Sequence, residues 1–302
     1  DLVEAAQLVG GFDLDVDPNG ATYTGSATIP GTLIDQFAID EKDGVLRLAT
    51  HVQLSNGNDW NETNALYTVA GAQGALAIHG RVEGVAPNEQ MYSARFVGNR
   101  GYFVTFKQVD PLFVFDLSDP AAPKLQGELT IPGFSEYMHP IDDGHLLTIG
   151  VDDGGWGLAL QIFDVTDPLR PLLAHKKSLG DSTSEALYEH KAFTFWRDML
   201  AIPVQGWDGD SYQAGLSLFS VDVNSGFGEK GTIDHSEFFD VDPSYDYCAP
   251  GGVRRGVFIE NFIYSVSDGG VLVHDVSDLG MPIAGAEFTS FDANDACEGY
   301  YY

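Results

Sequence analysis

Two stretches of this chain repeat one chemical pattern, a tyrosine followed two residues later by a histidine. The pairs are Tyr137 with His139 and Tyr188 with His190. Residues two apart on a β-strand point to the same face, so each pair would lie together. Imidazole is a common ligand of transition metals. Two such histidines with nearby carboxylates would make the metal site of a hydrolase-like enzyme.

Acidic residues alternate with other types in the stretches DLDVDPNG at 13–20 and FFDVDPSYD at 238–246. Carboxylates on one strand face repel each other, and Ca²⁺, which takes roughly six to eight oxygens, would relieve the repulsion. The first stretch is not an EF-hand, because Gly20 comes too late and Thr24 stands where the closing glutamate belongs. Solvated surface charge is the alternative reading. The candidate calcium ligands are Asp13, Asp15, Asp17, Asn19, Asp240, Asp242 and Asp246.

Two tryptophans stand among Asp and Gly in predicted linkers, Trp156 in GVDDGGWG and Trp207 in QGWDGDSYQAG. At an exposed tip, an indole ring can stack on a sugar or bind a protein partner. The alternative is that each ring packs on the edge of its own sheet. A third tryptophan lies in NDWNETN, which contains the glycosylation sequon at Asn61; a sequon has meaning only in a glycosylating host.

The two cysteines, Cys248 and Cys297, flank the last group of predicted strands. They are not accompanied by a Cys-x-x-Cys or Cys/His cluster, which argues against a zinc site. A disulfide between them is predicted if the protein is secreted, and free thiols are the alternative.

The elements that position these residues are short strands. Alternating segments bounded by Gly, Asp, Asn and Pro recur along the chain, and only residues 1–8 offer a weak helical candidate. The strands group in fours, five times over, which is typical of the blades of a β-propeller. The predicted fold is therefore an all-β propeller. Its blades cover residues 31–85, 86–133, 134–180, 181–237 and 248–290, and their first strands cover 33–39, 91–97, 135–141, 186–195 and 253–260.

Three similar stretches read VFDLSDPAAP (114–123), IFDVTDPLRP (162–171) and VHDVSDLGMP (273–282). Asp, Ser and Thr side chains bond local backbone groups, and Pro prevents a strand from continuing. We predict a turn between the third and fourth strands of a blade at each stretch, with cation binding by these aspartates as the less favoured reading. SVDVNSGFG is a variant of the same turn.

Residues 1–30 contain only a third and a fourth strand, AQLVGGFDLDV and ATYTGSATIPG, which predicts a partial blade. The missing strands would come from the tail at 291–302, from another chain, or from upstream sequence. The chain opens at Asp1 without Met or a signal peptide, which is consistent with a processed or excised form.

Aligning the first strands places a polar residue at nearly the same position in every blade. First strands line the central channel of a propeller, so these residues would form a ring. The ring could bind an anion through its arginines or a metal through its histidines. Alternatively its members bond one another and acids such as Glu185, Glu189 and Asp110, closing the channel. The ring candidates are Gln36, Arg95, His139, His190 and Arg255.

A long ordered series of segments resembles a family of secreted bacterial and archaeal β-propeller proteins of poorly characterised function. It includes EQMYSARFVGNRGYFVTFKQVDPLFVFDLSDP, LQIFDVTDP, SEALYEHKAFTFW and RRGVFIENFIYSVSDGGVLVHDV. The resemblance spans about residues 8–290 and implies a secreted propeller, with no established reaction or catalytic residues. Members of that family carry additional blades upstream, and the tail after Ser290 matches nothing in them.

Composition narrows the classes of partner. The chain has 15 basic and 45 acidic residues, a net charge of -30, which argues against nucleic acid and anionic membrane surfaces. It has no run of ~18 apolar residues, and it has no Walker loop, Gly-x-Ser-x-Gly elbow or His-Glu-x-x-His motif. Together with the location that the resemblance implies, these observations lead us to expect an extracellular or envelope module that binds or scaffolds a protein or glycan, with calcium as a candidate stabiliser. The alternatives are a metal-dependent enzyme at the channel mouth and a structural subunit of an extracellular assembly.

Overall fold

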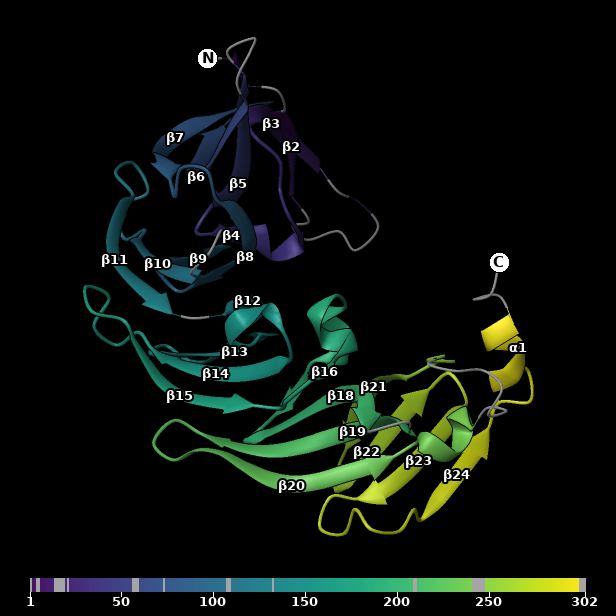
Figure 1. Cartoon of the computed structure of the whole chain (residues 1–302). Helices are drawn as coiled ribbons and strands as arrows, with labels where there is room; N and C mark the ends of the chain where they lie inside the picture. The colour runs from purple at the N-terminus through teal and green to yellow at the C-terminus, as the bar shows by residue number, and fades with distance from the viewer. Residues whose placement is uncertain are drawn as a thin grey trace. The chain divides into compact units, whose positions relative to one another are not determined.

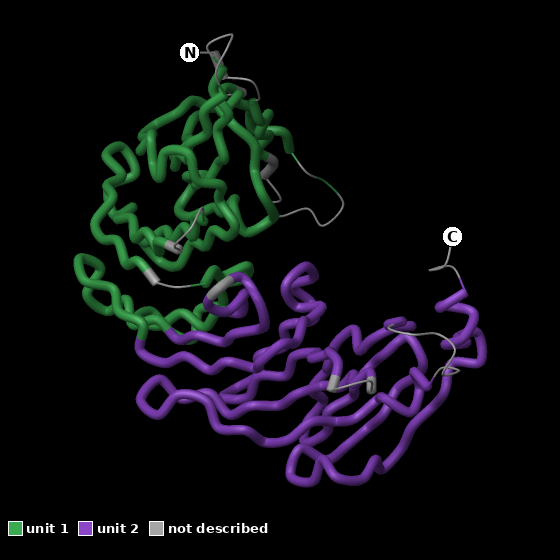
Figure 2. The backbone as a smooth tube through the Cα atoms, in the orientation of Figure 1, with its two compact units in different colours: residues 1–148, 163–173 green, residues 149–162, 174–302 purple. Residues whose placement is uncertain are grey.

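The computed structural model describes five sheets and a single α-helix within its described residues (Figure 1). The chain divides into two compact units, residues 1–148 with 163–173 and residues 149–162 with 174–302 (Figure 2). No helix in the described part is long and apolar enough to cross a membrane. The described residues are 2–3, 6–13, 20, 22–55, 60–72, 74–106, 110–131, 133–208, 211–240 and 248–298.

The first sheet lies in unit 1 and has seven strands, in the order β1-β5-β6-β7-β3-β2 with β4 paired to β5. Strands β2 and β3 form an antiparallel hairpin, and β3 joins β7 in parallel at Gly25↔Gly74 and Ser26↔Ala75. The two strands predicted for a partial blade therefore share a sheet with the strands of the first predicted blade. The bounds are β1 (Leu2–Val3), β2 (Ala6–Asp13), β3 (Thr22–Pro30), β4 (Ile39–Lys42), β5 (Val45–Ser55), β6 (Trp60–Ala72) and β7 (Gly74–Val85).

The remaining sheets are antiparallel meanders of consecutive strands, ordered β11-β10-β9-β8, β12-β13-β14-β15, β16-β18-β19-β20 with β17 on β18, and β21-β22-β23-β24. This is the strand grouping that the sequence predicts for blades. The bounds of the second and third sheets are β8 (Gln90–Val97), β9 (Arg100–Phe106), β10 (Asp110–Asp116), β11 (Lys124–Ile131), β12 (Phe134–Asp142), β13 (His145–Val151), β14 (Leu158–Asp164) and β15 (Leu172–Ser178). Those of the fourth and fifth are β16 (Ser182–Thr183), β17 (Thr194–Trp196), β18 (Met199–Asp208), β19 (Ser211–Asp222), β20 (Gly226–Asp234), β21 (Val253–Ile259), β22 (Phe262–Ser267), β23 (Gly270–Asp275) and β24 (Ala284–Glu287).

The predicted strand at 33–39 is wrong for most of its length. A 3₁₀ turn, η1 (Gln36–Ala38), occupies it, and the strand β4 starts only at Ile39. The cause is Asp35, whose Oδ1 accepts hydrogen bonds from the backbone N–H groups of Phe37 (2.7 Å) and Ala38 (2.9 Å). A side chain that caps local N–H groups in this way competes with strand pairing.

The predicted strand at 186–195 is wrong for the same reason. Two 3₁₀ turns, η3 (Glu185–Leu187) and η4 (His190–Ala192), precede the short strand β17. The hydroxyl of Ser184 accepts from the N–H of Ala186 at 3.1 Å, and the carboxylate of Glu189 accepts from the N–H of Lys191 at 3.0 Å. His190 therefore lies on a turn, where the two-residue alternation of a strand does not apply.

Packed side chains join neighbouring sheets within each unit. In unit 1, Leu66 of β6 packs with Phe103 and Phe113 of the second sheet, and all three are buried. The N-terminal hairpin contributes Val9 and Ile29 to a cluster around β5 and β6. In unit 2, a further cluster joins the fourth and fifth sheets through Leu216, Leu218, Ile233, Val253 and Ile263.

The predicted Asp–Pro turns have the expected local hydrogen bonds. In each of them, Oδ1 of the first aspartate accepts from both the N–H and the hydroxyl of the residue two positions later. The three pairs are Asp116 with Ser118, Asp164 with Thr166 and Asp275 with Ser277, each with contacts of 2.9 and 2.6 Å. The second aspartate likewise accepts from the N–H two positions on, at Asp119, Asp167 and Asp278.

The predicted disulfide is present in unit 2. Cys248 and Cys297 are bonded, with their Cα atoms 5.9 Å apart. The bond joins the segment before β21 to the six-residue helix α1 (Ala293–Glu298). Asp292 caps that helix, accepting from the N–H of Asn294 at 2.9 Å, and the ring of Phe291 packs edge-on against Phe239.

Candidate functional site

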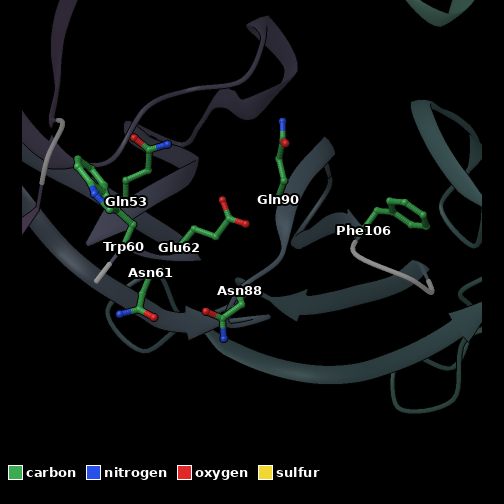
Figure 3. Close-up of a pocket in the computed structure, with 7 residues that line it drawn as sticks. All are labelled: Gln53, Trp60, Asn61, Glu62, Asn88, Gln90 and Phe106. Atoms are coloured by element: carbon green, nitrogen blue, oxygen red, sulfur yellow. The ribbon is translucent and has the colours of Figure 1, made fainter. Parts of the chain in front are cut away.

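A pocket of about 470 Å³ opens in unit 1 beside the start of β6. Figure 3 shows the carboxylate of Glu62 near its centre, with Gln53 and Trp60 to one side and Gln90 and Phe106 to the other. The residues that line it are Gln53, Trp60, Asn61, Glu62, Asn88, Gln90 and Phe106.

Strand pairing explains one wall of the pocket. Glu62 of β6 lies directly opposite Gln53 of β5 in the antiparallel register. Trp60 stands two residues before Glu62, so alternation places both side chains on one face of the sheet. The indole ring of Trp60 is 70% exposed, and Asn61 points away from Glu62 (Figure 3). An open aromatic surface therefore adjoins a carboxylate and an amide.

A chain of polar contacts runs from Glu62 into the sheet. The Oε2 atom of Glu62 lies 3.4 Å from Nε2 of His51, and Nδ1 of His51 lies 3.1 Å from Oδ1 of Asn64. Asn64 is fully buried, and its amide nitrogen donates to the carbonyls of Val85 (3.2 Å) and Glu89 (3.1 Å). Because that nitrogen donates, Oδ1 of Asn64 accepts and the Nδ1 atom of His51 carries the hydrogen. The backbone thereby fixes the amide of Asn64 and, through it, the imidazole of His51, whose Nε2 faces the carboxylate of Glu62.

The opposite wall begins at the turn between β7 and β8. Ala86 and Asn88 have positive φ angles of 47° and 63° there, a conformation that Asn tolerates better than Ala. The N–H of Asn88 donates to the carbonyl of Glu62 at 2.7 Å, which fastens the turn to β6. Such local strain is typical of functional sites, and here it brings Asn88 and Gln90 to the pocket.

Phe106 belongs to a group of three aromatic rings next to the pocket. Its ring centroid lies 6.0 Å from that of Tyr92 and 4.7 Å from that of Phe134. Burial raises the pKa of Tyr92, and the negative charges of Glu136 and Glu62 raise it further. Burial also raises the pKa of Glu136 to about 7. The wall at Phe106 is therefore aromatic, with carboxyl groups close to the ring of Tyr92.

Three of the five ring candidates belong to unit 1. Gln36 and Arg95 line a second pocket, of about 310 Å³. The guanidinium carbon of Arg95 lies 4.3 Å from the ring centroid of Phe37 and 5.7 Å from that of Tyr137. His139 is close by, since its ring centroid is 6.4 Å from that of Tyr137. Burial, helped by the charge of Arg95, lowers the pKa of His139 to about 4.

The other two ring candidates, His190 and Arg255, belong to unit 2. Nδ1 of His190 lies 3.3 Å from the carboxylate of Glu189. A backbone hydrogen bond from Lys191, together with the charges of His190 and Arg255, lowers the pKa of that carboxyl. The second predicted acid, Glu185, instead pairs with Arg254 at 2.9 Å.

The complete ring stays a prediction, because its members are divided between the two units. The side chain of Asp110, the third predicted acid, lies outside the described residues.

The predicted calcium sites also stay predictions. Asp15, Asp17, Asn19, Asp242 and Asp246 lie outside the described residues, as does the side chain of Asp13. Asp240 is exposed at the end of η5 (Ser236–Phe239). Within the described part of the chain, no group of three or more His, Cys, Asp and Glu side chains is placed to hold a metal.

The two predicted tryptophans differ in their surroundings. Trp156 follows the 3₁₀ turn η2 (Asp153–Gly155) and is 80% exposed. Trp207 is 38% exposed and contacts Tyr212, its partner across β18 and β19, at 5.4 Å between ring centroids. The hydroxyl of Tyr212 donates to the carbonyl of Gly251 at 2.6 Å. Trp207 therefore rests on its own sheet, whereas Trp156 is open.

Sequence reasoning missed the pocket at Glu62. It considered NDWNETN only as a sequon, although the W-x-E spacing places Trp60 and Glu62 on one strand face. That spacing is the one local signal. The remaining lining residues outside β6 come from β5, from the turn before β8, from the start of β8 and from β9, and local sequence does not reveal that they meet.

Comparison with known proteins gives a family match over most of the chain. A family model described as a beta propeller domain matches residues 9–279. An uncharacterised protein of Archaeoglobus fulgidus is 32% identical over 268 residues, covering 87% of this chain and 36% of that protein. An uncharacterised protein of Methanocaldococcus jannaschii is 37% identical over 246 residues, covering 80% of this chain and 35% of that protein. The chain thus spans about a third of the length of these curated relatives.

Two solved structures are similar at low sequence identity. The Nup133 beta-propeller domain of Vanderwaltozyma polyspora has a TM-score of 0.39 at 10% identity, over 77% of this chain and 71% of that chain. Sqt1 of Chaetomium thermophilum has a TM-score of 0.40 at 9% identity, over 80% of this chain and 69% of that chain.

Proposed function

The chain belongs to the beta propeller domain family, and from that premise we propose that it is a secreted or cell-envelope module that binds a neutral glycan. The predicted all-β propeller fold is confirmed by the family match and by the succession of antiparallel sheets. The observation that carries the proposal is the exposed indole of Trp60 beside the carboxylate of Glu62 in one pocket.

The chemistry of the pocket suits a sugar. A pyranose ring presents an apolar C–H face and a rim of hydroxyl groups. The exposed face of Trp60 offers a rigid surface for the apolar face. The carboxylate of Glu62 accepts hydrogen bonds, and the amides of Gln53 and Gln90 both donate and accept, which matches neighbouring hydroxyls.

The size and charge of the pocket narrow the class of glycan. Its volume of about 470 Å³ lies within the range of small-ligand sites, roughly 300–1,000 Å³. None of the side chains lining it is basic, and one is the carboxylate of Glu62. Uronic or sialic acids would meet negative charge without a cation to pair with, so the proposal is restricted to neutral sugars.

The proposed location is supported by the disulfide, because such bonds form and persist in oxidising compartments. The net charge of -30 suits a soluble surface in salty or calcium-containing surroundings. Calcium at the two acidic stretches, and completion of the propeller by another chain or an upstream segment, remain parts of the proposal.

A protein partner is the second candidate, favoured by the open ring of Trp156 in unit 2. An exposed tryptophan is a frequent anchor of protein interfaces. The metal-dependent enzyme and the structural subunit stay predictions from the sequence.

A glycan array tests the proposal. The labelled protein should bind a set of neutral oligosaccharides that share a terminal or internal residue. Trp60→Ala and Glu62→Gln should each reduce the signal on that set by at least tenfold. Trp156→Ala serves as the matched control and should leave it unchanged. Binding confined to acidic glycans, or equal binding by wild type and Trp60→Ala, would contradict the proposal.

A further inference from the structure

The second pocket of unit 1 contains an arginine that forms no ion pair with any acid in the described part of the chain. Arg95 lies on β8, is half-buried and faces the pocket of about 310 Å³. No ion pair to Arg95 is present among the residues that the structure describes. Its contacts there include the rings of Phe37 and Tyr137 and a side-chain hydrogen bond with Tyr137. The pocket is lined by Gln36, Phe37, Ile39, Asp40, Arg95, Phe96, Val97 and Pro140.

The acids close to this pocket are already engaged. The carboxylate of Asp40 accepts hydrogen bonds from Nε (2.8 Å) and Nη2 of Arg47. Arg47 is almost fully buried and also donates to the carbonyl of Gly98 at 2.5 Å, which holds the pair in place. The carboxylate of Asp35 caps two N–H groups of η1. The positive charge that remains for a ligand is that of Arg95.

The surroundings of Arg95 leave as the binding surface those N–H groups on the edge of its guanidinium that Tyr137 does not use. The ring of Phe37 contacts the guanidinium by a cation–π interaction, which uses the flat face of the group. The N–H groups on the edge form a planar fork that matches the two oxygens of a carboxylate. The amide of Gln36 lines the same pocket. We propose that this pocket binds a small organic carboxylate, with its oxygens on Arg95 and its body against the apolar walls.

The apolar walls separate an organic carboxylate from an inorganic anion. Phe37, Ile39, Val97 and Pro140 account for half of the lining. Phosphate or sulfate would leave those apolar surfaces exposed to water, whereas a carboxylate with an aromatic or aliphatic body would bury them. This site is independent of the proposed glycan pocket, because the two pockets share no lining residue.

Titration calorimetry with sodium benzoate and with inorganic phosphate tests the inference. Benzoate should bind saturably and at least tenfold more tightly than phosphate. Arg95→Gln should lose benzoate binding. Arg197→Gln is the matched control, because Arg197 also lies on an aromatic ring, 4.0 Å from the centroid of Trp196, and is not among the residues that line this pocket.

A second measurement on the wild-type protein covers the case in which Arg95→Gln does not fold. Phenylglyoxal modifies accessible arginines, and mass spectrometry locates the labels. Benzoate should slow the labelling of Arg95 severalfold and leave that of Arg197 unchanged. The inference would be overturned if benzoate failed to protect Arg95, if Arg95→Gln bound benzoate like the wild type, or if phosphate bound as tightly as benzoate.

Discussion

The carbonyl oxygen of Pro168 lies 2.1 Å from the position that a Cβ atom would occupy on Gly127. Gly127 is in β11, the last strand of the second sheet, and Pro168 is in the turn that follows β14. The same contact recurs one sheet earlier, where a Cβ on Gly80 would stand 2.4 Å from the carbonyl oxygen of Pro120. The Asp–Pro turns of the second and third sheets are therefore docking elements, each of which packs against a glycine of the preceding sheet.

Gly127→Ala should destabilise the protein by about 1–3 kcal/mol, because the added methyl group must displace a backbone carbonyl. Chemical denaturation would measure the loss in the free energy of unfolding. Gly280→Ala is a suitable control, since its Cβ would come no closer than 3.3 Å to a movable carboxylate oxygen of Asp278. Equal stabilities for Gly127→Ala and the wild type would contradict the docking contact.

Removal of the disulfide should cost about 2–4 kcal/mol, because the bond closes a long loop in the unfolded chain. Cys248 and Cys297 are 49 residues apart in sequence. Cys248→Ser with Cys297→Ser should lower the midpoint of denaturation, and a reducing agent should lower that of the wild type equally. The double variant should not respond to the reducing agent. Labelling of both thiols in the unreduced, denatured wild type would disprove the bond.

His235 should make stability depend on pH in the acid range. Burial lowers its pKa to about 4; the charge of His274 adds to this effect and that of Asp234 opposes it. The imidazole is 1% exposed, its Nε2 contacts the hydroxyl of Ser265 at 2.7 Å, and its Nδ1 lacks a hydrogen-bond partner among the described residues. Protonation is therefore easier in the unfolded chain than in the folded one.

The direction of this pH dependence follows from the number of protons that the folded and unfolded states bind. The unfolded state binds more protons between pH 6.5 and about 4, so stability falls as the pH is lowered through that window, by up to about 3 kcal/mol. His235→Gln keeps a donor for Ser265 and cannot be protonated, so its stability curve should be flatter there. The exposed His79→Gln should keep the wild-type slope. Parallel curves for His235→Gln and the wild type would contradict the assignment.

The sequence predicted the parts of the fold that depend on local pattern. Alternation placed most strands to within a few residues, and the Asp–Ser/Thr spacing identified turns whose hydrogen bonds the structure contains. It failed at 33–39 and 186–195, where Asp35, Ser184 and Glu189 cap turns in otherwise strand-like stretches. The parallel pairing of β3 with β7 joins residues about 50 positions apart, which no local pattern specifies.

The two candidate pockets also differ in how far the sequence predicted their residues. Arg95 and Gln36 were found by comparing repeated strands, and the structure places them in one pocket. The pocket at Glu62 was not predicted, because strand register and a strained turn assemble it from distant segments.

The most direct test of the proposed function is titration calorimetry with one neutral oligosaccharide selected by the array, on the wild type, Trp60→Ala and Trp156→Ala. The wild type should bind it with a single site per chain. Trp60→Ala should weaken binding at least tenfold, because the stacking surface is removed while the fold remains. Trp156→Ala should bind as the wild type does. Undiminished binding by Trp60→Ala, or loss of binding in Trp156→Ala, would contradict the assignment of the glycan site to the pocket at Glu62.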